Sequence, residues 1–244
     1  MIAHRYKLAI ATQLKSLFRL PAYWVPILLF PVMLFAMFGA GGSGISASYR
    51  MASFVIYGVI GVAFFQFGVA IAQDRESNWE RYRRTLPNAF GPLMVSRLVS
   101  ALVFVIQTAG LVIAAALFLS DPAISPGKII ALLLASLLIV IPFTLLSIAL
   151  GYWTNSRSAV AVANLLYLPL AYLGGLWMPP DRLPEGIASL SQFTPTRHAG
   201  EIGWAIIGAR QLPAVSVIWL IGFTLIFAAL AYWGYQRDQR KRFA

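Results

Sequence analysis

The chain has 244 residues, of which 59% are hydrophobic and 11% are charged. Soluble domains carry about 45–50% apolar and about 25% charged residues, so this composition excludes an ordinary soluble domain and indicates transmembrane helices of about 20 residues each. The net charge is +11, but the basic residues lie in short runs between apolar segments, which is typical of membrane topology and disfavours nucleic-acid binding.

Residues 1–21 predict a basic amphipathic helix. Apolar side chains share one face of a helical wheel, and most of the basic and polar side chains lie opposite. Such a helix lies in the membrane interface with its cations against anionic headgroups. Pro21 then permits a bend into the first apolar run. The helix serves as a topological anchor, as a contact for a cytoplasmic partner, or as both.

Residues 22–244 form the predicted membrane domain, an all-α polytopic fold with six transmembrane helices. Each apolar run is long enough to cross a bilayer, and Arg97 is the one charged residue inside them. The predicted spans are Tyr23–Ala40, Met51–Ala72, Val95–Leu119, Ile129–Trp153, Ala159–Met178 and Ala214–Tyr235.

The distribution of Lys and Arg predicts the orientation. Fourteen of the nineteen lie in the N-terminal segment, the loop after the second span, the turn after the fourth span, and the C-terminal tail. With six spans, all of these segments face the same side. The side richer in Lys and Arg is cytoplasmic, so both termini are expected in the cytoplasm.

The charged loop after the second span, residues 73–94, is long for a simple connection. A short charged helix here would be either a solvated topological element or a docking helix for a soluble partner, with Trp79 and Tyr82 as anchors. We favour the docking helix. Its candidate contact residues are Asp74, Arg75, Glu76, Trp79, Glu80, Arg81, Tyr82, Arg83 and Arg84.

Two further regions have an unusual composition. Residues 179–213, after the fifth span, are too apolar for a plain loop and too interrupted for a span, which predicts short helices at or within the outer leaflet. Within the spans, five polar or aromatic side chains could line a pathway, although helix packing is an alternative for each: Phe64, Phe65, Gln66, Asn164 and Tyr167.

These segments together resemble the type-2 ABC transporter permeases, the membrane subunits of bacterial exporters. The charged-loop pattern of that family is matched by Asp74-Arg75-Glu76, Glu80-Arg81 and Leu86-Pro87. Its pattern after the fifth span is matched by Gly174-Gly175, Pro179, Leu183-Pro184 and Pro195. Ser77-Asn78 replaces the common Gly-Thr, and Gly174 replaces the commoner Ser.

The resemblance implies that the charged loop is the coupling helix for a separate nucleotide-binding subunit. No phosphate-binding G-x-x-x-x-G-K-[ST] motif occurs in the chain, so ATP and Mg would bind to that partner and this chain would hold no cofactor or metal. Two copies, or this chain and a similar permease, would form a pathway lined by the first, second and fifth spans. The chain would not be an enzyme.

The expected location is the bacterial cell membrane, and the expected cargo is lipophilic or amphiphilic, such as a drug or antibiotic. A polysaccharide or a lipid-linked glycan is the alternative cargo within the same family. A secondary carrier is disfavoured because ionisable residues are scarce within the spans. A membrane-embedded enzyme is disfavoured because it would need a cluster of acidic, basic or metal-binding side chains. The chain has no cysteine, and its two histidines, His4 and His198, are far apart in the sequence. The predicted spans contain no carboxylate.

Overall fold

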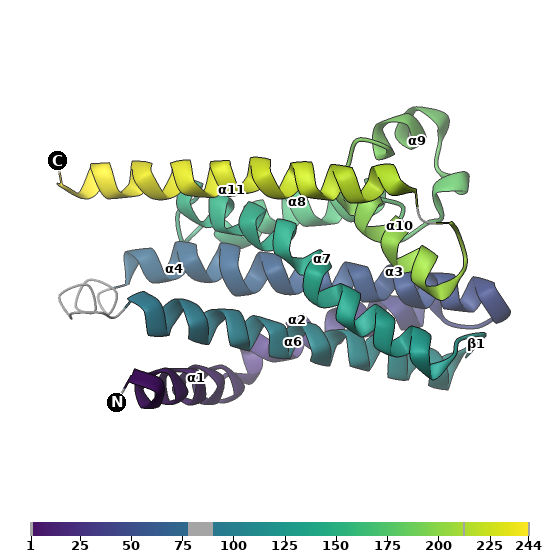
Figure 1. Ribbon diagram of the computed structural model, residues 1–244, viewed down its shortest axis with the longest axis horizontal. Coiled ribbons are helices and arrows are strands. Elements are labelled where there is room, and N and C mark those ends of the chain that lie inside the picture. Colours follow the sequence, from purple (N-terminus) through teal and green to yellow (C-terminus); the bar gives the residue numbers. More distant parts are fainter. Residues whose placement is uncertain (1, 78–89, 212, 244) are drawn as a thin grey trace.

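The computed structural model describes residues 2–77, 90–211 and 213–243. In these ranges most residues are helical, short loops and one two-residue strand join the helices, and the long helices run side by side in an elongated bundle (Figure 1). The predicted all-α polytopic fold is confirmed. The elements are α1 (Ile2–Phe18), α2 (Pro21–Leu34), the π-helix η1 (Phe35–Gly39), α3 (Gly44–Ala63), the π-helix η2 (Phe64–Val69), α4 (Ala70–Glu76), α6 (Phe90–Leu119), β1 (Asp121–Pro122), α7 (Pro126–Trp153), α8 (Ala159–Leu173), the 3-10 helix η3 (Pro180–Arg182), α9 (Glu185–Ser191), α10 (Pro195–Ile207) and α11 (Ala214–Phe243).

Five helical runs within the described residues are long and apolar enough to cross a membrane. They are Pro21–Gly39, Gly44–Glu76, Gly91–Leu119, Pro126–Trp153 and Ala214–Arg240. They correspond to five of the six predicted spans. The remaining prediction, Ala159–Met178, falls on α8, whose 15 residues rise about 23 Å against a hydrocarbon core of about 30 Å. The count of six spans therefore stays a prediction.

The second span is the central element of the bundle. α3, η2 and α4 form one continuous run, and 89% of its most apolar window is buried, compared with 22% for α11. The run begins at Gly44, seven residues before the predicted start. Gly41, Gly42 and Gly44 all have positive φ, and Arg50 donates a hydrogen bond to the Gly41 carbonyl, so the turn before the helix is short and held in place.

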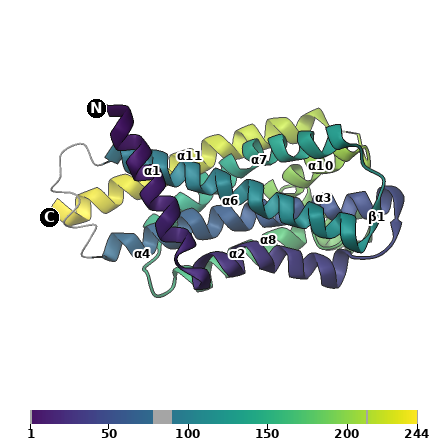
Figure 2. The same ribbon diagram turned by 90° about the horizontal axis from the view of Figure 1, so that it is seen from below.

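Both chain termini lie at one end of the bundle, next to α4, and β1 and α9 lie at the other (Figures 1 and 2). We call the first the terminal end, which includes residues 73–77, and the second the distal end, which includes residues 41–44. The N-terminal segment forms the predicted helix, α1, which packs along α6 and stacks Phe18 on Phe104 with ring centroids 5.5 Å apart. Its placement in a membrane interface stays a prediction.

The predicted short helices between α8 and α11 are present as η3, α9 and α10. Two sequence signals position α10. Thr194 caps its first turn by accepting a hydrogen bond from the Arg197 N–H at 3.3 Å, and Gly208 ends it with a left-handed φ of 81°. α10 packs against α3, α7 and α11, so it lies inside the bundle and not on its surface.

Candidate functional site

Arg75, on the last turn of α4, joins three helices at the terminal end. Its Nη1 donates hydrogen bonds to the carbonyl oxygens of Gly151 at 2.6 Å and Thr154 at 3.4 Å, at the C-terminus of α7. Its Nη2 forms an ion pair with Asp238 of α11, whose side chain is 5% exposed. Because the C-terminus of a helix carries partial negative charge, the guanidinium is stabilised from both sides.

The residues on either side of Arg75 bind other elements. Asp74 forms an ion pair with Arg97 of α6. Glu76 accepts hydrogen bonds from the Ser156 N–H at 3.0 Å and from the Ser156 hydroxyl, in the turn between α7 and α8. Three consecutive side chains therefore hold α6, α7, α11 and the α7–α8 turn around the end of the second span. We call residues 74–76 with these partners the terminal clamp.

The terminal clamp is the first part of the predicted coupling loop. The other predicted contact residues lie outside the described residues: Trp79, Glu80, Arg81, Tyr82, Arg83 and Arg84. Within the described part, Asp74, Arg75 and Glu76 contact their own bundle. Their sequence position suggested a role toward a partner, and their geometry shows that they join the end of the second span to the rest of the bundle. Contact between this loop and a partner stays a prediction.

The backbones of the second span and α7 come into contact at Gly68 and Gly151, next to the terminal clamp. A Cβ built on Gly151 would lie 2.8 Å from the Gly68 carbonyl oxygen, closer than side chains tolerate. Gly68 belongs to η2, and π-helices are frequent at functional sites. Glycine at position 151 is thus required by the close approach of these two helices.

The structure brings together three of the five predicted pathway residues. The Tyr167 ring lies 5.7 Å from the Phe64 ring and 6.4 Å from the Phe65 ring. The Tyr167 hydroxyl donates a hydrogen bond to the Tyr57 carbonyl at 2.8 Å. Phe64 and Tyr167 are buried in the core of the single chain, so in this conformation they fill space between helices instead of lining an open pathway.

The other two predicted pathway residues also have partners within the chain. Gln66 is buried, and its Oε1 accepts a hydrogen bond from the Tyr23 hydroxyl at 3.0 Å, which joins α2 to η2. Asn164 donates to the Val160 carbonyl of its own helix at 3.1 Å. The Gln66 Nε2 is buried without a hydrogen-bond partner among the described residues, and a place in a pathway stays a prediction for both residues.

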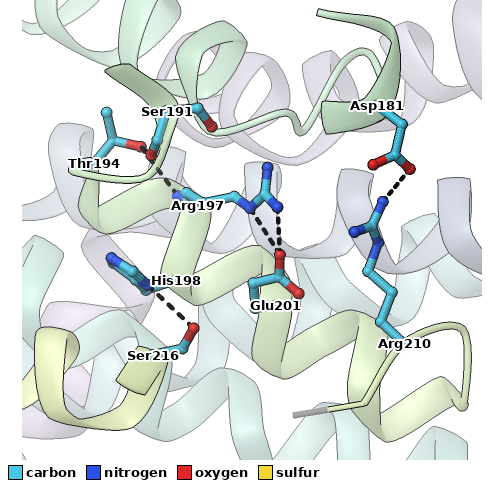
Figure 3. A network of polar contacts seen from close by, with 8 residues as sticks. All are labelled: Asp181, Ser191, Thr194, Arg197, His198, Glu201, Arg210 and Ser216. Atoms are coloured by element: carbon cyan, nitrogen blue, oxygen red, sulfur yellow. Dashed lines mark hydrogen bonds and ion pairs between the residues drawn. The ribbon is translucent and has the colours of Figure 1, made fainter. Parts of the chain in front are cut away.

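A second polar network lies around α10 at the distal end (Figure 3). Arg197 and Glu201, four residues apart on α10, form an ion pair with Nε to Oε1 at 2.7 Å, and their side chains are 16% and 7% exposed. Arg210, which follows α10, pairs with Asp181 of η3. His198 of α10 has its Nδ1 3.1 Å from the Ser216 hydroxyl of α11. We call this group the distal network.

Trp204 fastens the distal network to the second span. Its indole N–H donates to the Ser53 hydroxyl at 2.8 Å, and its ring stacks on Tyr49 with centroids 4.7 Å apart. The guanidinium carbons of Arg197 and Arg210 each lie 5.7 Å from the Trp204 ring. The cation–π contact with Trp204 and the ion pair with Glu201 together stabilise the Arg197 guanidinium inside the bundle.

Sequence reasoning did not identify the terminal clamp partner Asp238 or the Arg197–Glu201 pair. The second had a signal: a Thr-Pro start, basic and acidic residues spaced at i and i+4, and a glycine at the end together predict a capped helix with an internal ion pair. Asp238 had no such signal, because only the folded bundle brings it to Arg75.

Comparison with known proteins finds similarity to a transporter family over a range that includes much of both regions. The family model described as "ABC-2 type transporter" matches residues 4–208, from α1 to the end of α10. The chain is also 24% identical over 185 residues to the protein named "Putative transport permease YvfS" from Bacillus subtilis (strain 168), an alignment that covers 76% of this chain and 75% of that protein. The matched residues include 74–76 and Arg97 of the terminal clamp, and most of the distal network.

Proposed function

The chain belongs to the ABC-2 type transporter family, and from that premise we propose that it is the permease subunit of an ATP-driven exporter of a lipophilic or amphiphilic small molecule. The observation that carries the proposal is the terminal clamp, which joins residues 74–76, shortly before residues 78–89 in the sequence, to four parts of the bundle. In this proposal, a force that a partner applies to that loop would reach α6, α7, α11 and the α7–α8 turn together.

The proposed orientation has both termini and the terminal clamp in the cytoplasm of a bacterial cell. Two observations support it: both termini lie at the same end as the end of α4 (Figures 1 and 2), and the helix ends that meet there carry most of the Lys and Arg residues of the described chain. In this proposal α8 makes the fifth crossing. Its 15 residues would be extended by the segment from Gly174 to η3.

The proposed partner is a nucleotide-binding subunit that docks on residues 78–89 and hydrolyses ATP. Such docking can shift the bundle between two conformations only if the contacts differ between them. The terminal clamp gives the docked loop a direct connection to the helices that would have to move. Tight binding without this connection would leave the equilibrium of the bundle unchanged.

We propose that two copies enclose the pathway along the first and fifth spans. The second span was predicted to line it as well, but its burial within one chain argues for a central structural role. Exposed apolar side chains on α2 and α8 would then face the cargo, among them Phe30, Met33 and Leu165. An apolar surface of this kind suits a lipophilic or amphiphilic molecule.

Three measurements test the proposal. A tagged chain should copurify from its native membrane with a polypeptide that hydrolyses ATP. Glu80→Arg and Arg83→Glu should each lower ATP-dependent export from vesicles at least about tenfold while the chain still inserts. Arg182→Glu, a matched reversal of an exposed charge near the distal end, should leave export unchanged.

Full ATP-dependent export by both loop variants would overturn the coupling role of the loop. Purification of an active transporter with no ATPase would overturn the proposal that a partner subunit drives export with ATP.

A further inference from the structure

The last turns of α11 form a small hollow at the terminal end. Trp233, Gln236, Arg237 and Arg240 line this space of about 220 Å³. Their spacing of i, i+3, i+4 and i+7 places all four on one face of the helix. We call this group the α11 hollow.

Aromatic contacts hold one of the guanidiniums in place. The Trp153 ring, at the end of α7, meets the Trp233 ring edge-on with centroids 4.8 Å apart. The Arg237 guanidinium carbon lies 4.7 Å from the Trp153 ring. Both indoles remain exposed, Trp233 at 59%, so the hollow opens outward from the bundle. The site is therefore preformed by two helices.

The two arginines of the α11 hollow have no anionic partner in the described part of the chain. Asp238, which lies between them in sequence, is buried and paired with Arg75 on the other side of α11. Two guanidiniums thus face outward together, with the side-chain amide of Gln236 beside them. This arrangement fits a phosphate group, which guanidinium binds through charge-assisted hydrogen bonds.

The position along α11 indicates what carries the phosphate. Large apolar side chains are exposed on the preceding turns, including Leu225, Ile226 and Leu230, followed by the exposed aromatic residues Tyr232 and Trp233. Exposed aromatic residues of this kind mark the membrane interface. Arg237 and Arg240 lie about 6 and about 10 Å farther along the helix, at the depth of lipid headgroups.

We propose that the α11 hollow binds the phosphate of an anionic phospholipid in the leaflet at the terminal end. The two arginines bind the phosphate, and Trp153 and Trp233 pack against the glycerol and the first acyl carbons. A docked protein is disfavoured because the hollow continues directly from the apolar, exposed face of α11. The site does not depend on the proposed transport activity.

The test is tryptophan quenching by phospholipids with brominated acyl chains. The full-length protein in zwitterionic detergent is titrated with brominated phosphatidylglycerol or brominated phosphatidylcholine, with and without 10 mM inorganic phosphate. Near the headgroup depth each basic residue adds about 1 kcal/mol to anionic lipid binding, or about fivefold in affinity. The wild type should therefore prefer the anionic lipid, and Arg237→Gln/Arg240→Gln should lose about tenfold or more of that preference.

The control is Arg157→Gln/Arg182→Gln, which removes two exposed positive charges that lie outside both the α11 hollow and α1. It should keep the preference for the anionic lipid. An unchanged preference in Arg237→Gln/Arg240→Gln, or an equal loss in the control, would overturn the proposal. Loss of the preference on adding inorganic phosphate would assign the hollow to free phosphate. No preference in the wild type, with Trp233 shielded from every lipid, would assign it to a protein interface.

Discussion

The terminal clamp and the distal network use similar side chains, but they connect the chain in different ways. Arg75 and Asp238 are 163 residues apart, and Glu76 and Ser156 are 80 apart, so the terminal clamp joins helices from the whole sequence. Arg197 and Glu201 are one helical turn apart, and His198 and Ser216 are 18 apart. Asp181 and Arg210 are 29 apart, so the polar contacts within the distal network span shorter stretches of the sequence than these two contacts of the terminal clamp.

This difference shows that charge plays separate structural parts at the two ends. At the terminal end, each side chain of the terminal clamp joins the second span to a different part of the chain. At the distal end, the ionic contacts stabilise α10 and the segments next to it, while Trp204 and Lys128 attach that unit to the rest. The Lys128 ammonium does so by donating to the Ile207 carbonyl at 2.8 Å. Because the ionic contacts of the distal network lie within α10 and the segments next to it, these segments can shift together. The residues of the terminal clamp lie on several long helices and can move only when those helices move.

The largest expected effect is that of Arg75→Ala. It removes the ion-pair partner of a carboxylate with 5% side-chain exposure and two hydrogen bonds to α7. Removing one partner of a buried pair costs about 3–5 kcal/mol, and the partial exposure of Arg75 puts the expected loss near 3 kcal/mol in the free energy of unfolding. Denaturation by SDS in mixed micelles measures it.

Arg157→Ala is the matched control for Arg75→Ala, because Arg157 is exposed at the same end. Its expected effect is within about 0.5 kcal/mol. Equal losses for the two variants would mean that the terminal clamp does not hold the bundle.

The next effect is that of Glu201→Gln, which replaces the carboxylate of the Arg197 pair by a neutral acceptor. A hydrogen bond to a charged group contributes about 1.5–3 kcal/mol, so we expect a loss of about 2 kcal/mol, measured by the same denaturation. Combined with Arg75→Ala, the two losses should add within about 0.5 kcal/mol, because the sites lie about 40 Å apart along the bundle. Strong non-additivity would show that the two ends are coupled.

Asp181→Asn should have a smaller effect. The Asp181–Arg210 pair is exposed, with the Asp181 side chain at 73%, and exposed pairs contribute about 0–1 kcal/mol. We expect a change below about 0.5 kcal/mol in a thermal unfolding experiment. A loss above about 1 kcal/mol would instead give this pair a part in holding η3 and α9 against α10.

The smallest expected effect is a pH dependence due to His198. Burial lowers the pKa of His198, so the unfolded chain binds its proton more readily than the folded chain does. Stability is therefore expected to fall as the pH drops below the ordinary histidine range, near 6.5. Unfolding measured at pH 7.5 and 5.5 should show a drop that His198→Phe reduces and His4→Gln retains. An identical drop in all three proteins would assign it to other groups.

Much of the fold follows from hydropathy alone. The third, fourth and sixth predicted spans end or begin within a few residues of α6, α7 and α11, since long apolar runs without charges form helices in a membrane. Hydropathy does not distinguish a helix surrounded by lipid from one surrounded by protein. The central place of the second span therefore could not be predicted, nor could the burial of Phe64 and Tyr167.

The contacts of the charged residues were less predictable. Asp74, Arg75 and Glu76 stood out by sequence, but their partners come from three other parts of the chain and depend on how the helices pack. The sequences of the π-helices at Phe35–Gly39 and Phe64–Val69 contain no pattern that distinguishes them from α-helix. Their geometry arises from the packing of neighbouring helices.

The π-helix η2 also sets the angular position of residues 74–76. An α-helix turns by about 100° per residue, and a π-helical turn holds about one residue more than an α-helical turn. If all six residues of Phe64–Val69 adopted α-helix instead of π-helix, α4 would rotate by about 100° relative to α3. Asp74, Arg75 and Glu76 would then each point away from their present partners. The π-helical conformation of Phe64–Val69 therefore determines which helices the terminal clamp can contact.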